Sequence, residues 1–124
     1  MPSDPDFLNL FRHETTIVTL APGEALFREG EPADCMYVVR SGTVRVSTGT
    51  TVLEEFGPGT ILGEMALIEE SPRSATVTAV SDCEIAVVDR RRFLFLVQQT
   101  PSFALNVMKV LSHRLREMNR RYRY

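Results

Sequence analysis

The chain lacks several features that would assign it quickly to a class of protein. Its 124 residues include no Trp and only two Cys and two His. No apolar run approaches the roughly 18 residues that a membrane-spanning helix needs, and residues 1–6 are acidic, without the basic and apolar regions of a secretory signal. Cys35 and Cys83 are too far apart in the chain to indicate a zinc site or a disulfide framework. We therefore expect a soluble, cytoplasmic protein with reduced, partly buried thiols.

Patterns for catalysis and metal binding are also absent. A metal-dependent β-roll needs His side chains and a carboxylate that converge from neighbouring strands. His13 and His113 both fall outside the expected strands, and no Ser/His/Asp or Cys/His set has a supporting pattern. We therefore predict no catalytic residue, no metal and no cofactor, and we do not expect an enzyme.

Charge is unevenly distributed along the chain. Residues 1–89 hold 5 basic and 15 acidic groups, whereas residues 90–124 hold 9 basic and 1 acidic group. A basic tail can mark contact with nucleic acid or an acidic membrane, or it can be a solvated helix face that balances an acidic body. We favour the solvated face.

One cation stands alone within the acidic part. Between Arg45 and Arg90 the only basic residue is Arg73, although the same interval holds eight acidic residues. The simplest interpretation is an exposed pair with a neighbouring glutamate, which would contribute little to stability. The alternative is a specific partner for Arg73, and the residues around it favour this alternative.

Length and composition indicate one domain over residues 1–124, because a 44% hydrophobic chain of this size fits a single core. All seven glycines lie between positions 23 and 63, which places most turns in one region. Runs rich in β-branched residues, several of them alternating, predict short strands. The predicted strands are Thr16–Leu20, Met36–Arg40, Thr43–Ser47, Thr51–Phe56, Ala75–Val80 and Cys83–Asp89. Ser41-Gly42 predicts a two-residue hairpin connection between the second and third of them.

Helices are expected at both ends of the strand region. Residues 6–15 predict a short helix that turns Phe7, Leu8, Leu10 and Phe11 inward. Phe93, Leu94, Leu96 and Val97 fit a helix that ends before Pro101, and a second helix begins near Ser102. That last helix carries an apolar stripe, which either covers the open end of the strand region or forms a seam with a second chain. The stripe consists of Phe103, Val107, Leu111, Leu115, Met118 and Tyr122.

These patterns predict a mainly β fold with flanking helices. We expect an antiparallel β-roll, similar to a jelly-roll barrel, over residues 16–89. The short helix at 6–15 precedes the roll and two helices at 90–124 follow it. No Gly/Ser-rich linker, internal repeat or low-complexity segment separates these parts.

The most informative segment is residues 63–77, where a carboxylate and a guanidinium flank a short helix. Glu64 to Ile68 allows about one and a half turns, and its start would present backbone N–H groups to an anion. Arg73 supplies the fork geometry that phosphate prefers, and Ser74 could add a hydroxyl. Glu64 would face a donor such as a sugar hydroxyl. Together these groups describe a site for a nucleotide with one phosphate.

The segment resembles the phosphate-binding cassette of the cyclic nucleotide-binding domain family, in which Gly-Glu, a small residue and Leu precede Pro-Arg and two small residues. The resemblance extends from about residue 7 onward and includes Pro22-Gly23-Glu24 and Phe27-Arg28-Glu29-Gly30. It implies that Glu64 binds the ribose 2′-hydroxyl and Arg73 the cyclic phosphate. The N–H groups near Ala66 and the side chain of Ser74 would complete the phosphate site, which Gly63, Met65 and Ala75 would line.

The resemblance also implies which residues face the base. In catabolite-activator-like members the last helix reaches it, which gives Arg114, Met118 and Asn119 this role. Met118 and Asn119 replace the usual hydroxyl-bearing residues, so hydrogen bonding to adenine is not implied. Leu53 and Leu62 are either apolar walls of the site or plain core residues. Ser74, where some cGMP-preferring relatives carry Thr, favours cAMP slightly over cGMP.

The resulting functional hypothesis is a regulatory module whose last helix closes over the bound ligand and transmits its occupancy. Alternatives are the ligand-binding domain of a transcription regulator without its helix-turn-helix part, and an interaction domain of the same fold that binds no ligand. The chain stops at Tyr124, so direct DNA binding by this chain alone is not expected. Partners would be the cyclic nucleotide, an effector protein or domain, and a second copy paired through the last helix, but no membrane.

Overall fold

The computed structural model describes residues 7–122, with side chains as far as Arg120. The described chain divides into two compact units, with the boundary along the chain between Arg90 and Arg91. The first unit contains all the strands, and the second consists of helical chain. The expectation of one domain over residues 1–124 stays a prediction.

The first unit begins with the helix α1 (Phe7–Leu10) and then forms strands in chain order. The predicted helix started at Asp6, which lies outside the described residues, and its observed extent is shorter than 6–15. Phe7 and Phe11 are buried as expected, but Leu8 and Leu10 are exposed, so their inward placement was wrong. Residues four apart share a face of a helix. Phe7 and Phe11 lie on the buried face, and Leu8 and Leu10 do not.

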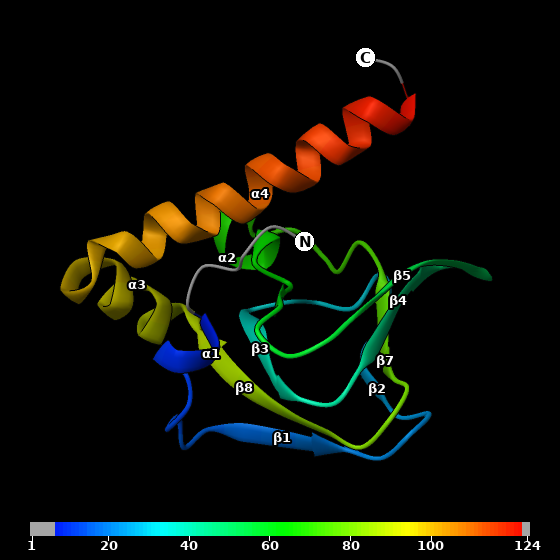
Figure 1. The fold of residues 1–124 in the computed structure, drawn as a ribbon, viewed down its shortest axis with the longest axis horizontal. Coiled ribbons are helices and arrows are strands. Elements are labelled where there is room, and N and C mark those ends of the chain that lie inside the picture. Colours follow the sequence, from blue (N-terminus) through cyan, green and yellow to red (C-terminus); the bar gives the residue numbers. More distant parts are fainter. Residues whose placement is uncertain (1–6, 123–124) are drawn as a thin grey trace. The chain divides into compact units, whose positions relative to one another are not determined.

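Eight strands form two antiparallel sheets of four strands each (Figure 1). The first sheet has the order β1 (Ile17–Leu20), β8 (Cys83–Asp89), β3 (Cys35–Ser41) and β6 (Ile61–Leu62). The second has the order β2 (Ala25–Phe27), β7 (Thr76–Ala79), β4 (Val44–Thr48) and β5 (Thr51–Phe56). The antiparallel β architecture with flanking helices is confirmed. The barrel closure is not, because the two sheets keep separate edges.

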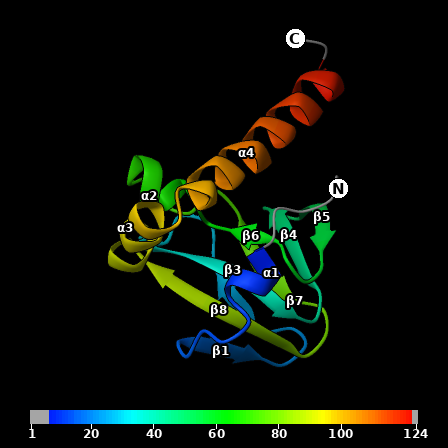
Figure 2. The ribbon, with the colours of Figure 1, turned by 60° about the vertical axis from the view of Figure 1, so that its left-hand side comes forward.

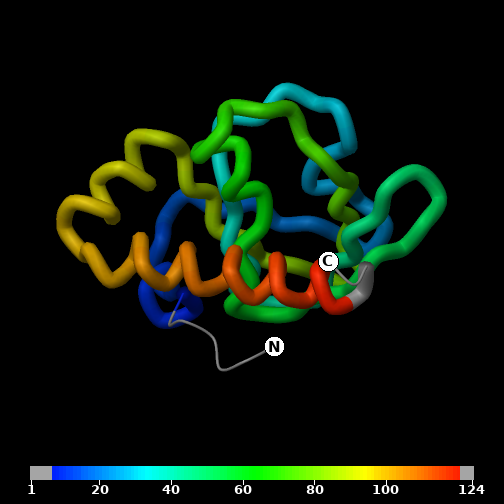
Figure 3. Tube along the Cα trace, turned by 90° about the horizontal axis from the view of Figure 1, so that it is seen from above, coloured from blue at the N-terminus to red at the C-terminus, as the bar shows by residue number. Residues whose placement is uncertain are grey.

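Six of the eight strands coincide with predicted runs to within a residue at each end. β2 and β6 were missed, since three and two residues are too few to show an alternating pattern. β7 shows why the longer runs succeeded: its Thr-Val-Thr-Ala sequence alternates half-buried and buried side chains. The β4–β5 hairpin projects from the body in the tube view (Figure 3).

The hairpin predicted at Ser41-Gly42 was wrong, because β3 and β4 belong to different sheets. The chain turns here from one sheet to the other, beside another such crossing, between β7 and β8, at Ser81 and Asp82. Val80 N–H donates to the Thr43 carbonyl at 2.9 Å, and Thr43 N–H donates to Ser81 Oγ at 3.0 Å. Gly42 has φ +88°, and a Cβ at this residue would lie 2.2 Å from the Asp82 carbonyl oxygen. The close contact between the two crossings therefore requires glycine.

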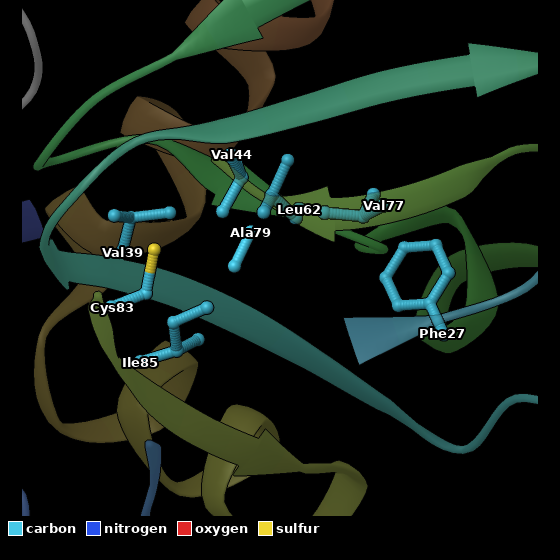
Figure 4. Close-up of a cluster of buried hydrophobic side chains, with 8 residues drawn as sticks. All are labelled: Phe27, Val39, Val44, Leu62, Val77, Ala79, Cys83 and Ile85. Carbon is cyan, nitrogen blue, oxygen red and sulfur yellow. The ribbon is translucent and has the colours of Figure 1, made fainter. Parts of the chain in front are cut away.

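Apolar side chains from both sheets meet in one buried cluster (Figure 4). Phe27 lies at one end of this cluster, and partly buried side chains such as Tyr37 pack against it. The cluster consists of Phe27, Val39, Val44, Leu62, Val77, Ala79, Cys83 and Ile85. Leu62 is thus a core residue.

The helical part contains α3 (Arg90–Gln99) and α4 (Pro101–Tyr122), drawn in yellow to red in Figure 2. Their connection is short: Thr100 N–H donates to the Leu96 carbonyl and Phe103 N–H to the Thr100 carbonyl, each at 2.8 Å. Phe93 packs edge-on against Phe103 with 5.5 Å between ring centroids. Both helices are therefore confirmed, as is the break before Pro101.

The apolar stripe of α4 is buried only in its first half. Phe103 and Val107 are buried, together with Val110, which the stripe did not include. Leu115 is 57% exposed and Met118 52% exposed. The side chain of Tyr122 lies outside the described residues. Among helices within residues 7–122, none is both long and apolar enough to cross a membrane.

Candidate functional site

The segment after β6 reverses direction at Gly63 and enters α2 (Met65–Glu69). Gly63 has φ +73°, a left-handed conformation that glycine adopts without strain. Glu64 occupies the N-cap position but makes no side-chain capping bond, and it is only 3% exposed. A glutamate side chain is seldom buried to this degree. The turn at Gly63 therefore precedes a buried Glu64 side chain.

Two backbone N–H groups at the start of α2 bond to nearby carbonyls. The N–H of Ala66 donates to the Gly63 carbonyl at 3.2 Å, and that of Leu67 donates to the Glu64 carbonyl at 3.1 Å. These two N–H groups are therefore used within the first turn of α2, and the expectation that N–H groups near Ala66 bind a phosphate stays a prediction. Ala66 contributes a small, buried side chain.

Arg73 is fixed at its backbone by the turn that follows β2. Its N–H donates to the Glu31 carbonyl at 2.9 Å, and its own carbonyl accepts from the Gly30 N–H at 2.8 Å. The turn is closed in its own right, since Arg28 N–H donates to a Glu31 carboxylate oxygen at 2.9 Å. Two hydrogen bonds in opposite directions on one residue leave its backbone little freedom. These two bonds therefore fix the backbone from which the Arg73 side chain extends.

The guanidinium of Arg73 lies in a pocket of neutral groups. It lies over the ring of Phe27 at 4.3 Å and near that of Tyr37 at 5.4 Å, and the two rings stack on each other at 5.8 Å. Nη1 donates to the Gly63 carbonyl at 3.3 Å, and Nη2 contacts the Cys35 sulfur at 3.6 Å. Such cation–π contacts contribute about 1–2 kcal/mol when they are shielded from water. We call Phe27, Cys35, Tyr37 and Gly63 the Arg73 cradle.

The charge of Arg73 is not neutralised within residues 7–122. Its side chain is buried, at 7% exposure, and no carboxylate in this part of the chain forms an ion pair with it. Its Nε is fully buried without a hydrogen-bond partner. Burying a cation in this way is unfavourable unless an anion joins it. The arrangement therefore suits an anionic ligand such as a phosphate.

Tyr37 reflects the same environment. Burial, followed by a hydrogen bond to Cys35, raises the pKa of Tyr37 to about 12, and the nearby charge of Arg73 opposes this rise. The phenol therefore stays neutral at physiological pH and does not compensate the guanidinium.

The remaining predicted residues are distributed unevenly. Ser74 is exposed and Ala75 half-buried beside Arg73, and Met65 is 38% exposed on α2. Leu53 lies on β5 and is 46% exposed, so it is not a core residue. Arg114, Met118 and Asn119 lie on α4, in the helical unit. The structure thus places the guanidinium of Arg73 against Gly63, and the roles of the α4 residues stay a prediction.

Sequence reasoning missed three members of the cradle: Phe27, Cys35 and Tyr37. Phe27 belongs to the short strand β2, which the pattern did not reveal. Cys35 and Tyr37 are two apart on β3 and therefore project to the same side of the strand. That alternation, seen beside a lone arginine, is the signal that could have suggested an aromatic and thiol environment. For metals, residues 7–122 contain no group of three or more His, Cys, Asp or Glu side chains arranged to hold an ion.

Known proteins match the strand region of this chain. Residues 17–100 match the protein family described as "Cyclic nucleotide-binding domain". The Cyclic AMP receptor protein of Thermus thermophilus is 36% identical over 100 residues, which cover 77% of this chain and 46% of that protein. Lysophospholipase nte1 of Aspergillus oryzae is 34% identical over 106 residues, covering 82% of this chain but 7% of that protein.

Solved structures agree with the sequence match. The crystal structure of Thermus thermophilus Catabolite Activator Protein superposes with a TM-score of 0.82 at 30% identity, covering 98% of this chain and 59% of that one. This chain spans less than half the length of the curated relatives described above.

Proposed function

The chain belongs to the cyclic nucleotide-binding domain family, and we propose that it binds a 3′,5′-cyclic nucleotide in the segment around Glu64 and Arg73. The observation that carries the proposal is the buried guanidinium of Arg73, which has no carboxylate partner within residues 7–122. A cyclic phosphate supplies the single negative charge and the acceptor oxygens that this group lacks. The fold of this family is typically regulatory and non-catalytic, so we infer a sensor rather than an enzyme.

In this proposal each part of the segment has a separate role. Arg73 binds the phosphate, and the exposed hydroxyl of Ser74 adds a donor next to it. Glu64, a buried carboxylate at the start of α2, accepts from the ribose 2′-hydroxyl. Gly63, Met65 and Ala75 line the site. N–H groups near the small, buried Ala66 complete the phosphate site.

The base and the output belong to the same proposal. We infer that α4 closes over the ligand, with Arg114, Met118 and Asn119 toward the base, and that this movement transmits occupancy to an effector. A ligand shifts such an equilibrium only by its difference in affinity for the two states. We infer cAMP as the preferred ligand over cGMP, with Ser74 as the supporting residue. The exposed half of the α4 stripe, at Leu115 and Met118, supports pairing with a second copy.

The size of the ligand gives an expected affinity. A cyclic nucleotide has about 22 non-hydrogen atoms, and about −0.3 kcal/mol per atom gives roughly −7 kcal/mol, or a Kd near 10 μM. Isothermal titration calorimetry with cAMP and with cGMP measures this value directly.

The variant Arg73→Ala tests the role of the guanidinium. Removing one partner of a buried charge pair costs about 2 kcal/mol or more, so the affinity should fall at least about 30-fold. Arg45→Ala is the matched control, because Arg45 is exposed and bonded to Glu55 at 2.8 Å on the surface of the same unit. Equal affinity of Arg73→Ala and the unmodified chain, with both folded by circular dichroism, would remove the support for the site.

A second candidate is the ligand-binding part of a longer transcription regulator. The likeness to the Thermus thermophilus structure favours it, since it covers 98% of this chain but 59% of that protein. The basic end of α4 alone is expected to bind duplex DNA weakly and without sequence preference. A gel shift with generic duplex at moderate salt tests this. Tight binding by this chain alone would favour a direct DNA-binding role, and the absence of both DNA and nucleotide binding would favour an interaction domain.

A further inference from the structure

Cys35 contacts the guanidinium of Arg73 through its thiol. It begins β3, is 8% exposed, and places its sulfur 3.6 Å from Arg73 Nη2. Tyr37, two residues further along β3, projects to the same side and meets the same guanidinium. A thiol sulfur is only a weak acceptor. It orients one arm of the guanidinium fork without neutralising its charge.

We propose that Cys35 is a positioning residue for Arg73, which holds the guanidinium ready for the phosphate without competing with it. A carboxylate at this position would pair with Arg73 and oppose an incoming anion. The thiol and the two aromatic faces hold the cation in place while leaving its charge available. Such pre-organisation raises affinity because the side chain loses little freedom on binding. The inference rests on the proposed function for the identity of the anion, but not for the contact itself.

The second buried thiol offers a natural contrast. Cys83 is 4% exposed and contacts two backbone carbonyls, those of Thr43 at 3.3 Å and Ser81 at 3.2 Å. It acts there as a donor at a crossing between the sheets and is not part of the Arg73 cradle. The two cysteines share residue type, burial and free thiol state, but only Cys35 contacts a charged group. Cys83 is therefore the matched control for any effect of replacing a buried thiol.

Three substitutions separate positioning from packing. Cys35→Val removes the acceptor with a larger side chain, Cys35→Ala removes it with a smaller one, and Cys35→Ser keeps an acceptor. We expect Cys35→Val and Cys35→Ala to weaken cAMP binding about 3- to 10-fold, the range of one modest hydrogen bond. Cys35→Ser should stay within about twofold of the unmodified chain. Cys83→Val should lower thermal stability but leave the affinity unchanged.

A second measurement reports on the Arg73 side chain itself and needs no nucleotide. The side-chain Nε–Hε signal of Arg73, assigned by its loss in Arg73→Lys, is recorded by ¹⁵N nuclear magnetic resonance. We expect it to shift and broaden in Cys35→Val and Cys35→Ala, because the guanidinium is released, and to stay near its original position in Cys35→Ser and Cys83→Val. A role in packing alone would not give this rescue by serine.

The outcomes separate this inference from the proposed function. If the unmodified chain binds neither cAMP nor cGMP, the proposed function fails, and the Nε signal alone decides whether Cys35 positions Arg73. If nucleotide binds and the signal and affinity are the same in Cys35→Val and the unmodified chain, the positioning role is overturned. It is also overturned if Cys35→Ser behaves like Cys35→Val, since a retained acceptor would then make no difference.

Discussion

Replacing Gly63 by alanine tests the geometry on which the site depends. A Cβ at Gly63 would lie 2.3 Å from Arg73 Nη1, 3.4 Å from its Cζ and 3.5 Å from Phe27 Cε2. The first distance is far below contact, so the guanidinium must leave its place between the rings and the Gly63 carbonyl. Two effects follow: backbone strain at a positive φ and displacement of Arg73.

Both effects can be estimated. A non-glycine residue in the left-handed region costs about 1–2 kcal/mol, and loss of the cation–π contact with the weak Nη1 bond adds roughly 2 kcal/mol. The total of about 3–4 kcal/mol corresponds to a fall in Tm of about 12–15 °C for a chain of this length. Loss of the charge-assisted bonds to phosphate should raise the Kd about 10- to 100-fold.

Gly23→Ala is the matched control for strain alone. Gly23 has φ +91°, and nothing lies within 4 Å of a Cβ placed on it. We expect its Tm to fall by about 4–8 °C, with unchanged nucleotide affinity. Differential scanning calorimetry and titration calorimetry on both variants measure the difference. If Gly63→Ala matches Gly23→Ala in both quantities, Arg73 does not lie against Gly63 and the described cradle is wrong.

Two further predictions concern pH and assembly. The folded pKa of Tyr37, about 12, lies above the ordinary value of 10, so its stabilising contribution is full below about pH 10 and declines as the pH rises toward 12. Tyr37→Phe should reduce this decline in chemical denaturation series, and an unchanged slope would contradict the assignment. If the exposed part of α4 pairs two chains, Leu115→Glu should convert a dimer into a monomer in sedimentation velocity, since Leu115 is 57% exposed. Equal masses for Leu115→Glu and the unmodified chain would exclude this seam.

The sequence predicted the strands whose length allows a pattern to appear. β5 and β8 match their predicted runs at both ends, and with six and seven residues they are long enough to be recognised from composition and flanking turns. β6 has only two residues, and its pairing with β3 is set by tertiary contacts rather than by local preference. The connection at Gly42 was misjudged for a related reason: a glycine turn indicates a reversal, but not which sheet the next strand joins.

Only those candidate site residues that are close together in sequence could be predicted from it. Gly63, Glu64 and Arg73 are close in sequence, so their chemical types and spacing could indicate a phosphate site. Phe27 on β2 and Cys35 on β3 contact Arg73 although they are distant from it in sequence. No local sequence pattern predicts such contacts. Sequence could therefore suggest what Arg73 binds, but not what holds Arg73 in place.

Arg73 is separated from other basic residues in the sequence and from carboxylates in the structure. In sequence it is the only basic residue between Arg45 and Arg90, and in the structure its buried side chain has no carboxylate partner within residues 7–122. A buried cation without a counter-ion destabilises the fold that contains it. A bound anion removes this penalty and stabilises the folded state by linkage. If Arg73 binds the phosphate as proposed, the free energy lost in burying its charge is recovered on binding, and this recovery contributes to the affinity.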